Sequence, residues 1–257
     1  MPPGIQDRYA RHEKLDFIGA EGQRRIGAST VLVVGCGSLG CAQAALLARA
    51  GVGRLLLADR DVVRPANLPT QLLYDEADVK ERAPKAEAAA SRLRAANSEI
   101  AVEPLAGEVS AANIEALASR ADLVMDATDN FETRFLLNEA AVKAGKPWIY
   151  GGVLGTDGMV MAVGPGKGPC LRCLLEIPAP ENRLPPPDVF GVLNAAAAWV
   201  AALQAAQALK ALACGAADWG RMHTLDIRNG SVTAAEVPRD PACPCCGRHE
   251  FKFLKPA

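Results

Sequence analysis

The stretch Val31-Leu32-Val33-Val34-Gly35-Cys36-Gly37-Ser38-Leu39-Gly40 decides the fold of this 257-residue chain. Its four apolar residues, most of them β-branched, predict a buried strand. The glycines that follow are spaced G-x-G-x-x-G, and the next run, 41–50, favours a helix. Glycines suit such a turn because it is tight and brings the backbone close to a phosphate, to which the new helix offers its free N–H groups. The stretch therefore predicts a strand–turn–helix unit that binds a nucleotide.

A carboxylate follows at the distance expected for such a unit. The apolar run Leu55-Leu56-Leu57-Ala58 predicts a second strand, and Asp59 ends it nineteen residues after Gly40. In nucleotide-binding units of this kind the acidic residue binds a ribose hydroxyl. On these features alone a nicotinamide dinucleotide is the default ligand, and a tight packing turn without a ligand is the alternative.

Composition narrows the class of protein. The formal net charge is −1, so no broad nucleic-acid or anionic-membrane surface is implied. No uninterrupted apolar run reaches the roughly 18 residues of a membrane span, since polar residues interrupt the Ala-rich stretch 195–213. The opening segment 1–14 is polar, unlike a signal peptide. We expect a cytoplasmic protein without a nucleic-acid or membrane partner, whose eight cysteines serve as metal ligands or in chemistry rather than in disulfides.

The rest of the chain alternates segments typical of strands and helices. Further strands are expected at 100–104, 123–126, 146–153 and 158–163, helices at 85–97, 111–119, 131–144 and 193–213, and a hairpin at 222–227 and 231–237 about a tight Asn229-Gly230 turn. This order predicts an α/β fold: a Rossmann-like, doubly wound and mostly parallel sheet with an added antiparallel portion. We expect one domain, 1–257, in four parts. These are an N-terminal helical arm (1–28), a nucleotide-binding core (29–165), a first cysteine pair with a crossing loop (166–192), and a long helix, hairpin and second cysteine pair (193–257).

Polar residues follow the expected strands at the edge where open α/β sheets bind ligands. The irregular loop 60–71 comes directly after the second strand. Lys85 follows Pro84 at the start of a helix and points a cation toward this edge, although an ordinary surface lysine is the alternative. Asp129 follows the strand 123–126, where a carboxylate can ligate Mg²⁺, cap the next helix, or do both.

Two cysteine pairs predict a metal site. Cys170-Leu171-Arg172-Cys173 and Cys243-Pro244-Cys245-Cys246 each hold a C-x-x-C unit, and 69 residues separate them. Two such units make a closed, structural four-thiolate zinc site, so we expect Zn²⁺ on Cys170, Cys173, Cys243 and Cys246, a structural clip that ties the tail to the body. A redox pair, two disulfides, and replacement of one ligand by Cys245 or His249 are the alternatives. Packing roles are expected for Cys36, Cys41 and Cys214.

In this order the motifs resemble the ThiF/MoeB/HesA family, bacterial relatives of ubiquitin-activating enzymes. The resemblance covers nearly the whole chain. It rests on the following motifs: Arg8-Tyr9-Ala10-Arg11, the GCGSLG turn, Ala50-Gly51-Val52-Gly53, Asp59-x-Asp61, Asn67-Leu68-x-x-Gln71, Pro84-Lys85, Asp126-x-Thr128-Asp129-Asn130 and both C-x-x-C pairs.

The resemblance implies an adenylyltransferase that uses ATP and Mg²⁺. Family members adenylate the C-terminal glycine carboxylate of a small ubiquitin-like sulfur carrier and release pyrophosphate. For this chain we expect such a carrier, or a short peptide, as the substrate. They are homodimers with shared sites, and Arg11 would reach the phosphates from the partner subunit. Catalytic roles would fall to Arg11, Lys85 and Asp129. The nucleotide and its metal would be bound by Gly35, Gly37, Ser38, Leu39, Gly40, Asp59, Asp61, Asn67, Gln71, Lys85, Thr128, Asp129 and Asn130.

Two departures from the family pattern bear on this expectation. The family loop usually reads Asn-Leu-x-Arg-Gln, but Thr70 stands here in place of the arginine. Because an arginine that neutralises a phosphoryl group is worth several powers of ten in rate, its loss predicts slower adenylation or replacement by Arg64, Arg82 or Arg134. Many members also carry a crossing-loop cysteine that forms a thioester or persulfide. Pro187 lies near that place, no cysteine occurs from 174 to 213, and a separate sulfur donor is therefore expected.

Two other functions stay open on the sequence alone. Thr70 and the missing loop cysteine would also suit a degenerate member that binds nucleotide or carrier as a scaffold. A nicotinamide-dependent oxidoreductase is suggested by the glycines and Asp59, but it gives Lys85 and Asp129 no role.

Overall fold

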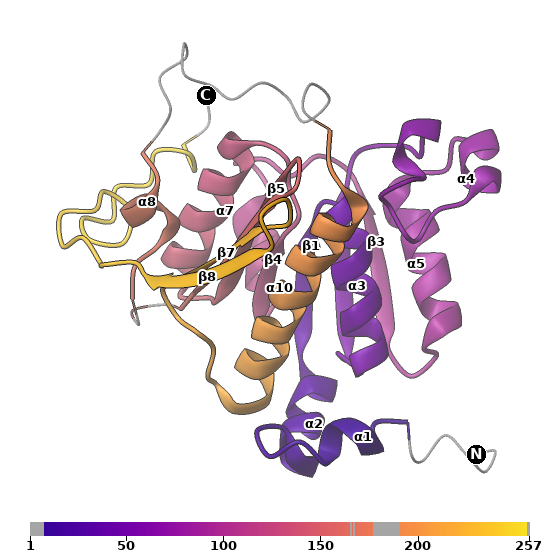
Figure 1. Ribbon diagram of the computed structural model, residues 1–257, viewed down its shortest axis with the longest axis horizontal. Helices are drawn as coiled ribbons and strands as arrows, with labels where there is room; N and C mark the ends of the chain where they lie inside the picture. The colour runs from indigo at the N-terminus through magenta and orange to yellow at the C-terminus, as the bar shows by residue number, and fades with distance from the viewer. Residues whose placement is uncertain (1–7, 165, 167, 177–190, 256–257) are drawn as a thin grey trace.

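The computed structural model describes residues 8–164, 166, 168–176 and 191–255. Its core is an eight-stranded sheet in the order β3-β2-β1-β4-β5-β6-β7-β8 (Figure 1). The first five strands in this order are parallel to one another: β3 (Ala101–Ala106), β2 (Arg54–Asp59), β1 (Thr30–Val34), β4 (Leu123–Asp126) and β5 (Trp148–Leu154). The last three are antiparallel: β6 (Asp157–Val163), β7 (Arg221–Asp226) and β8 (Ser231–Glu236). The predicted fold class, including its antiparallel portion, is confirmed.

Alternation of side chains along the parallel strands builds two separate cores. Val31 and Val33 of β1 face one hydrophobic cluster, whereas Leu32 and Val34 face the other. All four are fully buried or nearly so, as expected for a parallel strand covered on both faces. The apolar run that opens the sequence analysis is therefore a central strand.

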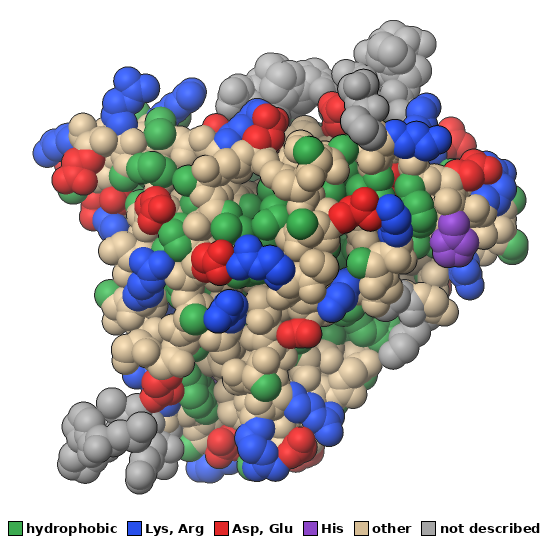
Figure 2. All heavy atoms as spheres, turned by 180° about the vertical axis from the view of Figure 1, so that it is seen from behind, with side chains coloured by type: hydrophobic (Ala, Val, Ile, Leu, Met, Phe, Trp, Pro, Cys, Tyr) green, Lys and Arg blue, Asp and Glu red, His purple; other side chains and the backbone are tan. Residues whose placement is uncertain are grey.

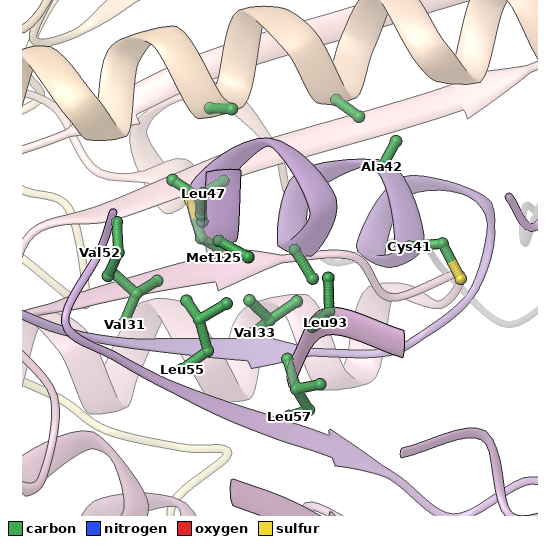
Figure 3. Close-up of a cluster of buried hydrophobic side chains, with 14 of the residues drawn as sticks. Val31, Val33, Cys41, Ala42, Leu47, Val52, Leu55, Leu57, Leu93 and Met125 are labelled. Atoms are coloured by element: carbon green, nitrogen blue, oxygen red, sulfur yellow. The ribbon is translucent and has the colours of Figure 1, made fainter. Parts of the chain in front are cut away.

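Helices of the first half and one late helix cover the first face. α3 (Ser38–Ala50), α5 (Lys85–Ala96) and α10 (Asn194–Cys214) contribute side chains to this cluster, which Figure 3 shows around β1 and β2. By length and composition α10 could cross a membrane. It instead packs on α3, β5, β6 and α2 (Gly19–Ala28), so its apolar character is that of a core helix.

The second face is covered by shorter helices and by the C-terminal tail. α6 (Ile114–Ser119), α7 (Phe131–Ala144) and the short α8 (Leu171–Leu174) lie here with the cysteines of the tail. Glu139 of α7 accepts hydrogen bonds from the backbone N–H groups of Lys252, Phe253 and Leu254, which hold the tail on this helix.

The remaining elements lie at the two ends of the sheet. α1 (Ala10–Glu13) packs on α2, and Figure 1 shows both at the lower end of the molecule, away from α4 (Glu76–Glu81). The short helix η1 (Pro65–Asn67) lies in the loop after β2. Figure 2 shows acidic and basic side chains interspersed on the rear face, in agreement with the balanced charge.

The N-terminal arm consists of two helices, α1 and α2, separated by residues 14–18. One local prediction needs correction. The β7–β8 hairpin is present, but its turn spans residues 227–230 rather than two residues, because Asp226 pairs directly with Ser231. The Asp226 carboxylate accepts hydrogen bonds from the backbone and side chain of Asn229, which stabilises the longer turn.

Candidate nucleotide site and metal centre

The glycine turn lies between β1 and α3 at the carboxyl edge of the sheet. Gly35 has φ +95°, and a Cβ there would lie 2.5 Å from the carbonyl oxygen of Ala127. At Gly40 a Cβ would lie 1.9 Å from the Gly35 carbonyl oxygen. At Gly37, by contrast, a Cβ would meet no described atom within 4 Å. The first and third glycines thus permit close packing, and the second leaves the backbone open to a ligand.

The N-terminus of α3 offers donors to this open space. Gly37 is its N-cap residue and no side chain caps the helix, so the first backbone N–H groups, including those of Ser38, Leu39 and Gly40, keep their donor capacity for a ligand. A helix N-terminus of this kind attracts anions because the N–H groups and the helix dipole both favour negative charge. The arrangement fits the phosphates of a nucleotide.

Asp59 holds the turn from the neighbouring strand. One of its carboxylate oxygens, Oδ2, accepts from the Cys36 N–H at 2.6 Å, and Oδ1 accepts from the Asp61 N–H at 2.7 Å. The half-buried carboxylate therefore lies beside the glycine turn, where a ribose-binding residue is expected.

Lys85 is not a surface lysine. Its side chain is 8 % exposed, and Nζ lies 3.2 Å from Oδ2 of the half-exposed Asp61. The backbone N–H of Lys85 also donates to the Asp61 carbonyl, so the start of α5 is fixed on the loop after β2. A cation held at this edge can contact a phosphate without first being ordered.

Tyr74 connects this cation to the glycine turn. Its hydroxyl lies 2.8 Å from the carbonyl oxygen of Cys36 and 3.1 Å from that of Lys85. Burial raises the pKa of Tyr74 far above its ordinary value, so the hydroxyl stays protonated and can donate. The sequence analysis missed Tyr74, because an aromatic residue in a loop carries no motif of its own.

The loop after β2 places the other expected residues near the turn. Asn67 Oδ1 accepts from the Arg64 N–H at 2.9 Å. Thr70, which replaces the family arginine, accepts a hydrogen bond from the Ser38 hydroxyl at 2.8 Å. Gln71 is buried, and its Oε1 atom finds no donor among the described residues. The loop thus folds directly against the start of α3.

The segment after β4 assigns helix capping to the residue that follows Asp129. Asn130, not Asp129, is the N-cap of α7, since its Oδ1 accepts from the Thr133 N–H at 2.9 Å. Capping by Asp129 was therefore a wrong alternative. Asp129 is exposed, and among the described residues its carboxylate is contacted by the Asn130 side-chain amide alone, at 3.3 Å. A free carboxylate at this edge fits Mg²⁺, which takes one or two carboxylates together with substrate phosphates.

An ion pair lies beneath this segment. Arg134 Nε is 3.5 Å from Oδ2 of Asp126, whose side chain is fully buried. Burial raises the pKa of Asp126, while Arg134 and hydrogen bonds from Thr128 act in the opposite direction. Of the cations expected to replace the missing arginine, Arg134 is thus buried and engaged, whereas Arg64 and Arg82 are exposed. The role of Arg134 beside Asp126 was missed, because the loop 127–130 and the first turn of α7 separate it from the end of β4.

Arg11 lies at the opposite end of the sheet. It is exposed on α1, and the neighbouring Tyr9 packs over Gly51, which precedes β2 at the amino edge. Within one chain, Arg11 is therefore not brought to the glycine turn.

The four predicted metal ligands come together. The Sγ atoms of Cys170, Cys173, Cys243 and Cys246 all lie within 4.8 Å of one another, with 3.7 Å between Cys170 and Cys243 and 3.4 Å between Cys173 and Cys246. These distances are near the ~3.8 Å edge of a tetrahedron with Zn–S bonds of about 2.3 Å. They are too long for disulfides, whose S–S bond is about 2.0 Å. The residues fit a closed zinc site.

The other cysteines take different places. Cys245 is buried and its Sγ accepts from the Asn138 side-chain amide at 3.2 Å, and His249 is exposed; neither belongs to the four-thiol group. A hydrogen bond with Cys245 and burial raise the pKa of Cys170 to about 12. Cys36 and Cys41 are core residues as expected. The packing role expected of Cys214 was wrong, because this residue is exposed at the end of α10.

Comparison with known proteins decides the family. The ThiF family model matches residues 9–245. The chain belongs to the ThiF family. Among its relatives, the sulfur carrier protein ThiS adenylyltransferase of Bacillus subtilis is 42% identical over 251 residues, which cover 96% of this chain and 73% of the relative. The SAMP-activating enzyme E1 of Haloferax volcanii is 38% identical, covering 94% and 88%, and a sulfur carrier protein adenylyltransferase of Thermus thermophilus is 39% identical, covering 94% and 90%.

Solved structures support the fold. The crystal structure of E. coli MccB with ATP superposes with a TM-score of 0.81 at 23% sequence identity, covering 96% of this chain and 75% of that chain. At this identity the likeness concerns the arrangement of the sheet and helices alone.

Proposed function

We propose that this ThiF-family chain is an ATP-dependent adenylyltransferase that activates the C-terminal carboxylate of a ubiquitin-like sulfur-carrier protein. The observation that carries the proposal is the buried Lys85 held beside an open glycine turn, because a dinucleotide-dependent oxidoreductase has no use for that cation. The names of the relatives, which include adenylyltransferases of sulfur carriers, point to the same reaction.

The reaction forms a bond between a carboxylate oxygen of the carrier and the α-phosphorus of ATP. The bond between the α-phosphorus and the bridging oxygen breaks, and pyrophosphate leaves with the electron pair. A carboxylate is a poor nucleophile toward an anionic phosphate, so the site must align both groups and neutralise charge. Lys85 and Asn67 would contact phosphates, the N–H groups of α3 would hold them, and Asp59 would bind the ribose. Asp129 would hold Mg²⁺, which neutralises phosphate charge when bound.

The rest of the assembly follows from the same proposal. Residues 1–257 form one adenylation domain, with Zn²⁺ on the four-cysteine clip. The chain is a homodimer, because Arg11 lies at the far edge of its own sheet and would serve the partner's nucleotide site. The protein works in the cytoplasm, and sulfur comes from a separate donor protein, since the segment aligned with the family's loop cysteine lacks one. That segment, around Pro187, lies outside the described residues.

Carrier-dependent exchange of labelled pyrophosphate into ATP tests the proposal. The purified chain is incubated with ATP, Mg²⁺ and a candidate carrier that ends in Gly-Gly, and a carrier that lacks this dipeptide serves as the control. We expect exchange with the first carrier alone. A short peptide substrate would instead support exchange without any carrier protein. Tight ATP binding without exchange on any carrier or peptide would overturn the reaction and favour a nucleotide-binding scaffold, which Thr70 in place of the arginine would also suit.

A further inference from the structure

A clamp of hydrogen bonds encloses Thr128, the residue directly before Asp129. Oδ1 of the fully buried Asp126 accepts from both the N–H of Thr128, at 2.9 Å, and its hydroxyl, at 2.7 Å. On the other side, Nη2 of Arg134 donates to the Thr128 carbonyl oxygen at 2.7 Å. The backbone N–H, the carbonyl oxygen and the hydroxyl of Thr128 are therefore all held by the Asp126–Arg134 pair.

The pair itself is fixed by its surroundings. Arg134 is buried, and its guanidinium carbon lies 5.4 Å from the ring centre of Phe131 and 5.6 Å from that of Tyr150. The second oxygen of Asp126 faces Arg134 Nε and the Gly151 N–H, each at 3.5 Å. A buried ion pair gives weak net stabilisation because both charges lose their hydration. Its position around one peptide therefore points to a task other than stability.

We propose that Asp126 and Arg134 are positioning residues that fix the Thr128 peptide and thereby hold the Asp129 carboxylate in place for the Mg²⁺ of bound ATP. The inference rests on the proposed function for the identity of the ligand. Asp129 is suited to this role because Asn130 caps α7 in its place and leaves its carboxylate exposed. A residue that orients a metal ligand typically affects metal affinity by about 10- to 100-fold.

Direct contact of Arg134 with the triphosphate is the competing role. Its Nε atom is buried without a hydrogen-bond partner among the described residues. The two roles differ in what they do to ATP in the absence of metal. A positioning residue leaves metal-free ATP binding unchanged, whereas a phosphate ligand weakens it.

The test uses the full-length protein and the variant Arg134→Lys. The lysine keeps a positive charge beside Asp126 but cannot reach Asp126 and the Thr128 carbonyl together as the planar fork does. Binding of ATP is measured by calorimetry in buffer without added divalent cations, which leaves the structural zinc in place, and binding of Mn²⁺ to the ATP complex is measured by electron paramagnetic resonance. We expect 10- to 100-fold weaker Mn²⁺ binding, with metal-free ATP affinity within about twofold of the parent. Lys143→Gln, at the exposed end of the same helix, serves as the control and should change neither quantity.

A second variant separates positioning from general disturbance of the fold. In an Asp129→Asn background, Arg134→Lys should weaken Mn²⁺ binding by no more than about twofold further, because both residues act through one carboxylate. Full multiplication of the two effects would overturn the inference, as would an equal loss of ATP binding in the absence of added divalent cations. If Arg134→Lys fails to fold, Thr128→Val takes its place, because it removes the hydroxyl bond to Asp126. This variant should also bind Mn²⁺ more weakly. Unchanged Mn²⁺ affinity in Thr128→Val would overturn the inference. These arms need no carrier, so a failure of pyrophosphate exchange in the parent counts against the proposed function alone.

Discussion

Replacement of Lys85 by methionine tests the charge of the nucleotide site separately from its fold. The substitution keeps the length and the apolar stem of a side chain that is 8 % exposed, and it removes the ammonium group. Its partner Asp61 is half exposed at 50 %, so solvent can take over the hydration of this carboxylate. Loss of a pair with one such exposed member changes the free energy of unfolding by about 1 kcal/mol or less. The fold should therefore survive.

Catalysis should respond far more strongly. A preorganised donor aimed at charge that develops in the transition state is worth about 10²- to 10³-fold in rate, or roughly 3–4 kcal/mol. We expect pyrophosphate exchange to fall by that factor in Lys85→Met, while the urea midpoint changes little. The matched control is Lys80→Met, which removes an exposed lysine of α4 and should leave the exchange rate unchanged. Exchange within threefold of the parent, or a stability loss large enough to account for the lost rate, would refute the assignment of Lys85.

Two further predictions concern the glycine turn and the cysteine clip. Gly37→Ala should fold normally but bind ATP at least tenfold more weakly, because its Cβ enters the open space above the turn. Gly40→Ala should instead lower the melting temperature, since its Cβ would lie 1.9 Å from the Gly35 carbonyl oxygen. Equal behaviour of the two variants would contradict the structure. Mass spectrometry and metal analysis should find one Zn²⁺ per chain in the parent and in Cys245→Ser. Cys243→Ser should lack zinc and unfold at a lower temperature. Retention of zinc by Cys243→Ser would rule out the assigned ligand set.

The sequence was sufficient to predict those features that depend on local spacing. The G-x-G-x-x-G turn, the order of strands and helices and the two C-x-x-C pairs each follow from residues close together in the chain. The cluster of four thiols could be predicted across 69 residues because two C-x-x-C units are the ligand pattern of a closed zinc site. The comparisons with relatives confirm the family on which the functional interpretation rests.

Contacts between distant elements could not be predicted in the same way. The Tyr74 hydroxyl bridges the glycine turn and the start of α5, and the Asp126–Arg134 pair forms only when α7 packs beneath the end of β4. The choice of Asn130 over Asp129 as the helix cap depends on which of two adjacent residues has the extended backbone conformation of an N-cap. Composition gives no information on that choice, because both residue types are good caps.

The charged groups at the nucleotide edge have a net negative charge, which opposes the binding of a triphosphate. Two buried cations lie here, Lys85 and Arg134, and each faces a carboxylate of its own, Asp61 or Asp126. Asp59 and Asp129 add two more negative charges, so these six groups are net acidic where a triphosphate must bind. An arginine in place of Thr70, as the family pattern implies, would offset one of those negative charges. Here the Thr70 hydroxyl accepts a hydrogen bond from Ser38 and adds no charge. Further cations at this edge reduce the electrostatic repulsion between the carboxylates and the phosphates. Under the proposed function, Mg²⁺ at Asp129 and Arg11 of a second subunit would supply these cations.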